Sequence, residues 1–331
     1  MSLRVGLAGA GFIGRVHARI LARDPRVTLV GVADVAADTA RRLADEVGSR
    51  PFPGIEPLLD AGLDALYVCT PNRLHADPVL AGLERGLHVF SEKPMATSLA
   101  DAWRIREAAR RARGIYQIGF NRRFSYVYRF VKRLLAEGRL TPRVAHLKMN
   151  RGELQEPPWT GDPGVTGGYL YETPIHLLDT SRHLLGEVAE VQGWARQSVY
   201  AEPDGFTLLV RFCSGVTATL ATVAHTSWLF PFERVELYGV HQAVVTEEME
   251  AASFSPGPRA QVEALECRHI PFEEKWGYTE EDRLFVSAAL GREPPAVTAE
   301  DGYRATELVE ACYRAIRQDG PVRLPLPEPS T

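Results

Sequence analysis

The chain has 331 residues, of which 45% are hydrophobic and 24% are charged, and its formal net charge at pH 7 is −4. This length favours two domains, and the composition is that of an ordinary globular protein. The charge balance argues against a nucleic-acid or anionic-membrane partner, and no apolar stretch is long enough to span a membrane. The four cysteines are widely spaced and form no Cys-x-x-Cys pair, so they indicate neither a disulfide framework nor a zinc site. We therefore expect a cytoplasmic protein.

Over the first 120 residues, short apolar runs alternate with segments of helical spacing. The apolar runs, which we interpret as buried parallel strands, are Arg4–Ala8, Thr28–Ala33, Ala65–Cys69, His88–Ser91 and Tyr116–Gly119. The segments of helical spacing include Thr39–Val47, Ala76–Arg85 and Leu99–Arg113. Alternation of strand and helix predicts an α/β fold with a doubly wound parallel sheet.

After residue 120 the pattern changes to a series of alternating strands. A helix is predicted over Tyr126–Glu137. The predicted strands are Val144–Asn150, Val191–Val199, Phe206–Phe212, Thr217–Val223 and Arg234–Tyr238. Such a series indicates a mostly antiparallel sheet in a second domain. A final helix is predicted over Ala299–Arg317, opened by the capping sequence TAED.

A glycine motif, GAGFIG, follows the first predicted strand with G-x-G-x-x-G spacing. Glycines in this spacing permit a tight turn and bring the amides of a helix N-terminus close to a pyrophosphate; in the alternative reading they only close a turn. Asp34 ends the next predicted strand, 20 residues after Gly14, where a carboxylate accepts hydrogen bonds from a ribose. Because its charge repels a ribose phosphate, NAD is favoured over NADP. The predicted cofactor contacts here are Gly9, Gly11, Phe12, Ile13, Gly14 and Asp34.

Two more motifs come directly after predicted strands, where open α/β sheets bind ligands. The first is CTPN, and the second is SEKP. Lys93 is one of only four lysines in an arginine-rich chain, and lysine, unlike arginine, can exchange a proton in catalysis. For Lys93, the alternative to a catalytic role is a surface lysine paired with Glu92. For His75, the alternative to a cofactor contact is a residue that only caps a helix or packs in the interior. The predicted cofactor contacts of these motifs are Thr70, Pro71, Asn72, His75, Glu92 and Lys93.

The segment GGYLYETPIHLLD places Glu172, His176 and Asp179 at offsets of four and three, so that on a single helix they would share one face. We expect that helix to begin with Thr173 as its N-cap and Pro174 in its first turn.

Taken in this order, the motifs resemble those of the Gfo/Idh/MocA oxidoreductase family, which includes glucose-fructose oxidoreductase and inositol 2-dehydrogenase. The resemblance covers essentially the whole chain and extends to GFNRRF at 119–124 and PPAVTAEDGYRATELVEACYRA near the end. It implies an NAD-binding Rossmann domain over residues 1–120. It also implies a substrate-binding and oligomerisation α/β domain over residues 121–331, whose open sheet commonly builds homodimers or homotetramers.

The resemblance further implies that Lys93 and His176 are catalytic and that the acid four residues before the histidine falls on position 172. Two positions depart from the family pattern, since Glu172 replaces the usual aspartate and Pro174 the usual glycine. Glutamate is longer by one methylene and can direct its carboxylate at a different hydroxyl. Substrate identity is therefore less determined than the chemistry.

The expected reaction is hydride transfer between a secondary alcohol and nicotinamide, which requires a base and an oxyanion stabiliser at one hydroxyl. We assign the base to His176 and the stabiliser to Lys93, although the two roles could be exchanged. Glu172 would orient Lys93 or hold the substrate.

Several further residues are predicted to contact the substrate. They are Asp179, Asn121, Arg122 and Trp159, and Asn121 is also a candidate for the nicotinamide. Three of them have a structural alternative: a helix acid for Asp179, interdomain ion pairs for Arg122 and packing for Trp159. The acids and histidines of 172–183 could hold a metal, but the sequence shows no second ligand cluster and we predict no metal.

We therefore predict an NAD-dependent dehydrogenase that acts on a sugar, cyclitol or related polyol. The alternatives are a reductase or dehydrogenase of a non-sugar substrate, of the dihydrodiol or biliverdin reductase type, and a non-catalytic NAD-binding sensor. The presence of both Lys93 and His176 argues against the sensor.

Overall fold

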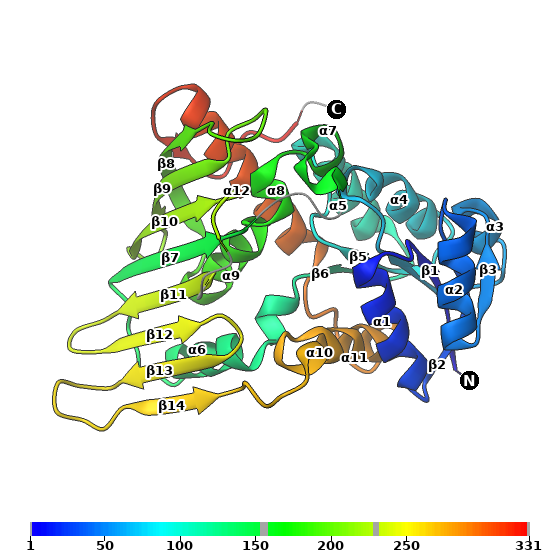
Figure 1. Cartoon of the computed structure of the whole chain (residues 1–331), viewed down its shortest axis with the longest axis horizontal. Helices are drawn as coiled ribbons and strands as arrows, with labels where there is room; N and C mark the ends of the chain where they lie inside the picture. The colour runs from blue at the N-terminus through cyan, green and yellow to red at the C-terminus, as the bar shows by residue number, and fades with distance from the viewer. Residues whose placement is uncertain (1, 153–157, 228–231, 330–331) are drawn as a thin grey trace. The chain divides into compact units, whose positions relative to one another are not determined.

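The computed structural model describes residues 2–152, 158–227 and 232–329, which form two compact units (Figure 1). The first unit extends to Phe120 and also contains Tyr278–Thr306. The second consists of Asn121–Gly277 and the chain from Glu307 onward. The segment Tyr278–Thr306 thus groups with the first unit, although it follows the second unit's Asn121–Gly277 in the chain.

The first unit contains a six-stranded parallel sheet in the order β3-β2-β1-β4-β5-β6, and this confirms the predicted doubly wound fold. Its strands are β1 Leu3–Ala8, β2 Val27–Ala33, β3 Arg50–Phe52, β4 Ala65–Val68, β5 His88–Glu92 and β6 Tyr116–Gly119. The edge strand β3 is not among the predicted runs, because it has three residues and one of them is a proline.

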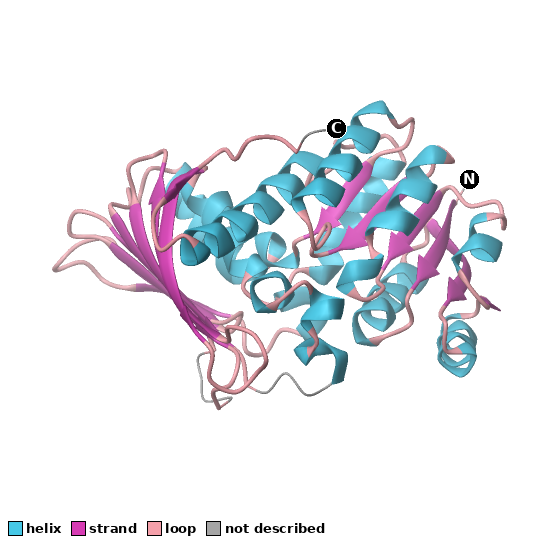
Figure 2. Ribbon diagram, turned by 90° about the horizontal axis from the view of Figure 1, so that it is seen from above, coloured by secondary structure: helices cyan, strands magenta, loops and turns pink. Residues whose placement is uncertain are grey.

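Helices lie on both faces of this sheet (Figure 2). They are α1 Phe12–Arg23, α2 Ala37–Val47, α3 Ile55–Leu59, α4 Ala76–Glu84, α5 Leu99–Arg111 and α11 Tyr278–Ala289, and a 3-10 turn, η1, covers Asn72–Leu74. Because crossover helices cover both faces, β4 and β6 are buried throughout and β1 and β5 nearly so, which is why these strands read as continuous apolar runs.

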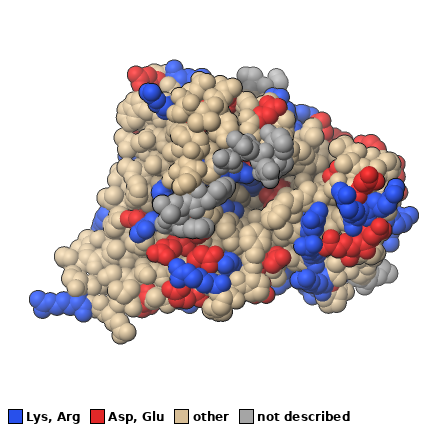
Figure 3. Space-filling view, in the orientation of Figure 1, with Lys and Arg blue, Asp and Glu red and all other residues tan. Residues whose placement is uncertain are grey.

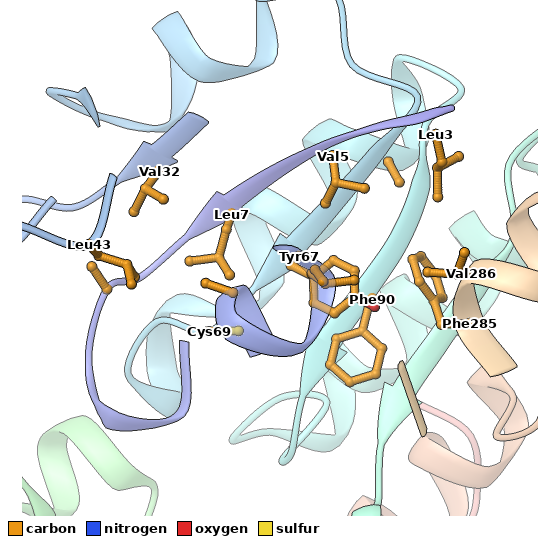
Figure 4. Packing of buried hydrophobic residues seen from close by; sticks show 14 of the residues in the cluster. Leu3, Val5, Leu7, Val32, Leu43, Tyr67, Cys69, Phe90, Phe285 and Val286 are labelled. Carbon is orange, nitrogen blue, oxygen red and sulfur yellow. The ribbon is translucent and has the colours of Figure 1, made fainter. Parts of the chain in front are cut away.

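The core of the first unit joins residues from its N-terminal strands to residues of α11 (Figure 4). Tyr67 of β4 stacks on Phe90 of β5, with ring centroids 4.6 Å apart, and Phe285 of α11 meets the Tyr67 ring edge-on at 5.1 Å. All three side chains are fully buried. Burial of these aromatic surfaces explains why α11 packs with a sheet formed almost 200 residues earlier in the chain.

The second unit contains a nine-stranded sheet in the order β14-β13-β12-β11-β7-β10-β9-β8-β15. Neighbouring strands are antiparallel except for β7 and β10, which are parallel. The strands are β7 Val144–Asn150, β8 Val188–Arg196, β9 Gly205–Phe212, β10 Thr217–Val223, β11 Glu233–Tyr238, β12 Ala243–Glu247, β13 Ala251–Ser255, β14 Glu263–Glu266 and β15 Val322–Arg323. This confirms the predicted mostly antiparallel sheet, although β12 to β15 are not among the predicted strands.

One face of this sheet is buried and the other is exposed. In β9, Phe206, Leu208, Val210 and Phe212 are buried, whereas the residues between them are partly or fully exposed. The helices α6 Tyr126–Ala136 and α9 Ile175–Leu185 contact the sheet, and in Figure 2 no helix of the described residues covers its other face. The other helices of this unit are α7 Pro163–Thr166, α8 Tyr169–Glu172 and α10 Phe272–Lys275, with 3-10 turns η2 Asn121–Phe124 and η3 Pro158–Gly161.

The last helix, α12, covers Ala299–Arg317, the range that the sequence pattern predicts. The hydroxyl of Thr298 accepts from the amide of Asp301, and the Asp301 carboxylate accepts from the Thr298 amide, which is the reciprocal capping expected of TAED. Among the residues described, no helix combines the length and apolar character that crossing a membrane requires.

Candidate functional site

The glycine loop connects β1 to α1. Gly9 has a φ of +98°, a conformation that strongly favours glycine. A Cβ added to Gly9 would lie 2.3 Å from the Cys69 carbonyl oxygen, and one added to Gly14 would lie 1.9 Å from the Gly9 carbonyl oxygen. A Cβ on Gly11, the N-cap of α1, would meet no atom within 4 Å. Two glycines are therefore required by packing, whereas the third leaves the backbone at the helix N-terminus open to a phosphate.

Two further residues of the loop, Phe12 and Ile13, differ in exposure. Phe12 is 73% exposed, whereas Ile13 packs against the core of the first unit.

Asp34 follows β2 and is bonded to the glycine loop. Its Oδ2 accepts from the amide of Ala10 at 2.8 Å, and its Oδ1 accepts from the amide of Ala36 at 2.9 Å. A carboxylate can accept about four hydrogen bonds, so the half-buried Asp34 retains capacity for ribose hydroxyls. The loop and the acid together have the chemistry that an adenine dinucleotide requires.

The CTPN segment follows β4, beside β1 in the sheet. Asn72 is buried in η1, and the Thr70 hydroxyl donates to the carbonyl of Leu74 at 3.2 Å. His75 is buried with its Nδ1 2.7 Å from the Pro94 carbonyl and its Nε2 2.7 Å from the Thr70 carbonyl. Burial lowers the pKa of His75 despite these two carbonyl partners. His75 thus joins the CTPN and EKP segments.

The EKP segment follows β5, the next strand along the sheet. Glu92 is buried, and its Oε2 accepts from the backbone amide of Lys93 at 3.0 Å, while Lys93 itself is half-buried. Although burial alone would raise the pKa of Glu92, a hydrogen bond from His17 and the charges of His17 and Lys93 lower it. The carboxyl ends of β1, β4 and β5 therefore carry the three predicted cofactor motifs along one edge of the sheet.

In the second unit, Glu172 and His176 do not share a helix. Glu172 ends the short helix α8, Thr173 is its C-cap, and α9 begins at Ile175 after Pro174. The expectation of one helix with Thr173 as its N-cap is therefore wrong. One guanidinium nitrogen of Arg151 donates to Glu172 Oε1 at 3.0 Å and to the Thr173 hydroxyl at 3.1 Å, which recruits the threonine side chain and holds the break between the helices.

His176 lies in the first turn of α9, and both it and Arg122 are buried. The Arg122 Nη1 is 3.4 Å from His176 Nε2. Arg122 also pairs with the fully buried Glu233 at 3.3 Å and lies over the ring of Trp276 at 4.7 Å. The amide of Asn121 donates to the Trp276 carbonyl at 2.9 Å. The 121–124 turn is thus fixed against β11 and the segment before residue 277.

Asp179 is fully buried and makes a two-pronged ion pair with Arg123, with distances of 2.6 Å and 2.8 Å. This pair anchors α9 to η2, and a contact of Asp179 with substrate stays a prediction. Trp159 is half-buried in η3. The sequence part that precedes it, 153–157, lies outside the described residues.

Sequence reasoning missed several charged residues of these networks, namely His17, Arg151 and Glu233, and also Asp282, whose carboxylate is 2.8 Å from His17 Nδ1. His17 had a signal, because it occupies the inner face of α1 three residues after Gly14. The others had none, since each is a common residue type whose partner is distant in sequence.

A glycine loop closed by an acid after β2, in a parallel doubly wound sheet, defines a dinucleotide-binding protein. Comparison with known families makes this specific. The model of the oxidoreductase family, NAD-binding Rossmann fold, matches residues 3–120, and the model of the oxidoreductase family, C-terminal α/β domain, matches residues 132–324. The chain belongs to the Gfo/Idh/MocA oxidoreductase family, and its N-terminal part is an NAD-binding Rossmann domain.

Similar proteins cover the whole chain. Myo-inositol 2-dehydrogenase of Thermotoga maritima is 27% identical over 339 residues, which cover 97% of this chain and 98% of that protein. Inositol 2-dehydrogenase 2 of Saccharopolyspora erythraea is 30% identical over 336 residues, covering 96% and 94%. The WlbA dehydrogenase of Bordetella pertussis, solved in complex with NADH and UDP-GlcNAcA, shares the fold with a TM-score of 0.84 and 22% identity over 99% of this chain and 100% of that one.

Proposed function

We propose that the protein is an NAD-dependent dehydrogenase that transfers hydride between a secondary alcohol of a sugar, cyclitol or related polyol and the nicotinamide. The observation that carries the proposal is the place of Lys93, a lysine directly after β5 at the edge of the sheet that also carries the glycine loop. Two full-length relatives named as inositol 2-dehydrogenases support a cyclitol or polyol substrate.

Oxidation of an alcohol requires that the carbon lose a hydride and its hydroxyl lose a proton. Bound NAD supplies the hydride acceptor. His176 accepts the hydroxyl proton, while the Lys93 ammonium donates a hydrogen bond to the same oxygen and stabilises its developing negative charge. In the reverse direction the same two residues polarise and protonate the carbonyl oxygen.

The contact of Arg122 with His176 supports the role of His176 as a base. A guanidinium has donors and no acceptor, so it can hydrogen-bond to Nε2 only when that nitrogen carries no proton. The contact therefore selects the neutral tautomer with its proton on Nδ1, and Nε2 is the nitrogen that has a lone pair for the proton of the substrate hydroxyl.

Glu172 differs from the family's aspartate and already has a cationic partner in Arg151. We propose that this pair presents one carboxylate oxygen to a substrate hydroxyl. A glutamate held by an arginine reaches a different position from an aspartate, so a substrate other than the inositols stays within the proposal.

The test is reduction of NAD, and separately of NADP, across inositols, aldoses, sugar acids and simple diols. Lys93→Ala and His176→Ala are compared with Lys275→Ala, which removes a lysine paired with Glu250, and with His183→Ala on the same helix α9. We expect turnover of at least one polyol with NAD and a loss of about 10²- to 10⁴-fold in the two site variants, the range for general acid–base groups. The two controls should keep the wild-type rate.

NAD binding, followed by protein fluorescence, should survive in all four variants. Tight NAD binding without turnover of any panel member in either direction would contradict a polyol dehydrogenase. Wild-type turnover in Lys93→Ala and His176→Ala would contradict the assigned roles.

A further inference from the structure

His17 is a fully buried histidine that joins two carboxylates. It lies on α1, and its Nδ1 is 2.8 Å from Oδ1 of Asp282 on α11. Its Nε2 is 3.1 Å from Oε1 of Glu92 at the end of β5. One imidazole ring thus connects α1, α11 and the end of β5, where Glu92 directly precedes Lys93.

Both nitrogens of His17 face carboxyl oxygens, and an imidazolium donates to both of them. Burial alone would lower the pKa of His17, but the charges and hydrogen bonds of Asp282 and Glu92 outweigh it and raise that pKa well above its ordinary value. The rings of Phe90 and Tyr67 lie 5.0 Å and 5.6 Å from the imidazole. They enclose the ionic cluster in apolar surroundings.

An overlapping set of side chains offers a metal site as the alternative: ligand atoms of His17, Glu92 and Glu281 lie within 4.8 Å of one another. Since both ring nitrogens of His17 already face carboxylates, neither has a lone pair to offer a cation. The geometry therefore favours an ionic hydrogen-bond chain over a metal.

A buried ion cluster contributes little net stability compared with apolar side chains of the same volume, because desolvation of the charges offsets their attraction. We therefore consider which groups the cluster of Asp282, His17 and Glu92 orients. While Oε1 of Glu92 is bonded to His17, Oε2 accepts from the Lys93 amide at 3.0 Å. On the other side of Lys93, the carbonyl of Pro94 is 2.7 Å from His75 Nδ1. A buried histidine thus supports the backbone on each side of Lys93: His17 acts through Glu92 before it, and His75 contacts Pro94 after it.

We propose that His17 is a positioning residue for catalysis: the chain of hydrogen bonds from Asp282 through His17 to Glu92 fixes the 92–94 turn and thereby directs the Lys93 ammonium. This inference rests on the proposed function of Lys93. His17 itself touches neither substrate nor cofactor in this scheme, and its effect passes through Glu92.

The test is a double-mutant cycle of His17→Gln and Lys93→Ala, measured on the polyol of highest turnover at saturating NAD. His17→Gln alone should lower kcat by about 10²-fold, the cost of misplacing a catalytic group by about 1 Å, while KM for NAD stays near the wild-type value. In the Lys93→Ala background the same change should have no further effect on the residual rate. A merely structural role would lower the rate by the same factor in both backgrounds and would overturn the proposal.

His88→Asn is the matched control, because it alters a histidine at the opposite end of β5 and should leave kcat unchanged. Asp282→Asn keeps the shape of the side chain and replaces His17→Gln in the cycle if that variant does not fold. Crystal structures of wild type and variant with NAD provide a reading without substrate: a displaced 92–94 turn supports the proposal, and an unmoved Lys93 ammonium refutes it. Full turnover in Lys93→Ala would instead refute the proposed function, so the two failures are distinguishable.

Discussion

Substitution of Gly14 by alanine provides a severe test of the glycine loop. The added Cβ would lie 1.9 Å from the Gly9 carbonyl oxygen, whereas ordinary contact begins at 3.4 Å, so the two groups must separate by 3.4 − 1.9 = 1.5 Å. Gly9 has little room to move away, because its backbone packs against that of Cys69 so closely that a Cβ built on Gly9 would lie 2.3 Å from the Cys69 carbonyl oxygen. The atoms that obstruct the added Cβ, at Gly9 and behind it at Cys69, are therefore backbone atoms, which cannot rotate out of the way as a side chain can.

Overpacking of this kind costs about 3 kcal/mol, and the better helix propensity of alanine returns at most about 1 kcal/mol. We therefore expect Gly14→Ala to destabilise the first unit by roughly 2 kcal/mol. For a unit of this size that lowers the Tm by about 4–8 °C.

Gly11→Ala is the matched control in the same loop. Its added Cβ meets no atom within 4 Å, so the Tm without cofactor should not change. NAD affinity should nevertheless fall by about tenfold or more, because the methyl group occupies the space where a pyrophosphate approaches the backbone. Thermal unfolding without cofactor and titration with NAD, carried out on both variants, test these two expectations. A wild-type Tm in Gly14→Ala, or a wild-type NAD affinity in Gly11→Ala, would refute this reasoning.

Three further predictions concern other parts of the chain. Asp34→Ser should shift the NAD-to-NADP preference by about tenfold or more, measured as the ratio of kcat/KM, since repulsion between two charges about 4 Å apart is worth ~1–4 kcal/mol; an unchanged ratio would remove Asp34 from cofactor selection. Burial lowers the pKa of His88 below 6.5, and its Nδ1 accepts from the amide of Ile115 at 3.2 Å. Between the folded and unfolded pKa values of His88, the unfolded state binds more protons than the folded state. The stabilisation that neutral His88 gives the folded state is therefore complete above about pH 6.5 and is lost as the pH falls through the folded pKa. Urea midpoints should show that slope in the wild type and a weaker one in His88→Asn. Trp194 and Leu209 are 50% and 43% exposed on the open sheet face; if this face forms the expected oligomer, Trp194→Glu should yield monomers in sedimentation, and an unchanged mass would place the interface elsewhere.

The surface in Figure 3 agrees with the composition in one respect. Lys and Arg are interspersed with Asp and Glu on this face, as a small net charge allows. Exposed pairs such as Arg104 with Asp101 contribute little to stability.

The sequence by itself determined what depends on near neighbours in the chain. The five apolar runs of the first domain and strands such as β7 and β10 follow from local periodicity, and α12 follows from its capping sequence. The place of the three motifs that we assign to the cofactor was also predictable, because strand ends in a parallel sheet meet at one edge and each motif directly follows its strand. The order of these motifs was enough to indicate the family.

Only the tertiary structure decided which distant residues meet. His17 contacts Glu92 and Asp282, which are 75 and 265 residues away in sequence, and no periodicity records such pairings. The sequence places Asp179 on the same helix face as His176, but only the path of the chain brings its ion-pair partner Arg123 close to it. The break between the helices of Glu172 and His176 likewise depends on Arg151, which lies outside both helices and donates a hydrogen bond to Glu172. Local patterns determine secondary structure because their interactions span a few residues, whereas buried charges take the partner that the completed fold brings within hydrogen-bonding distance.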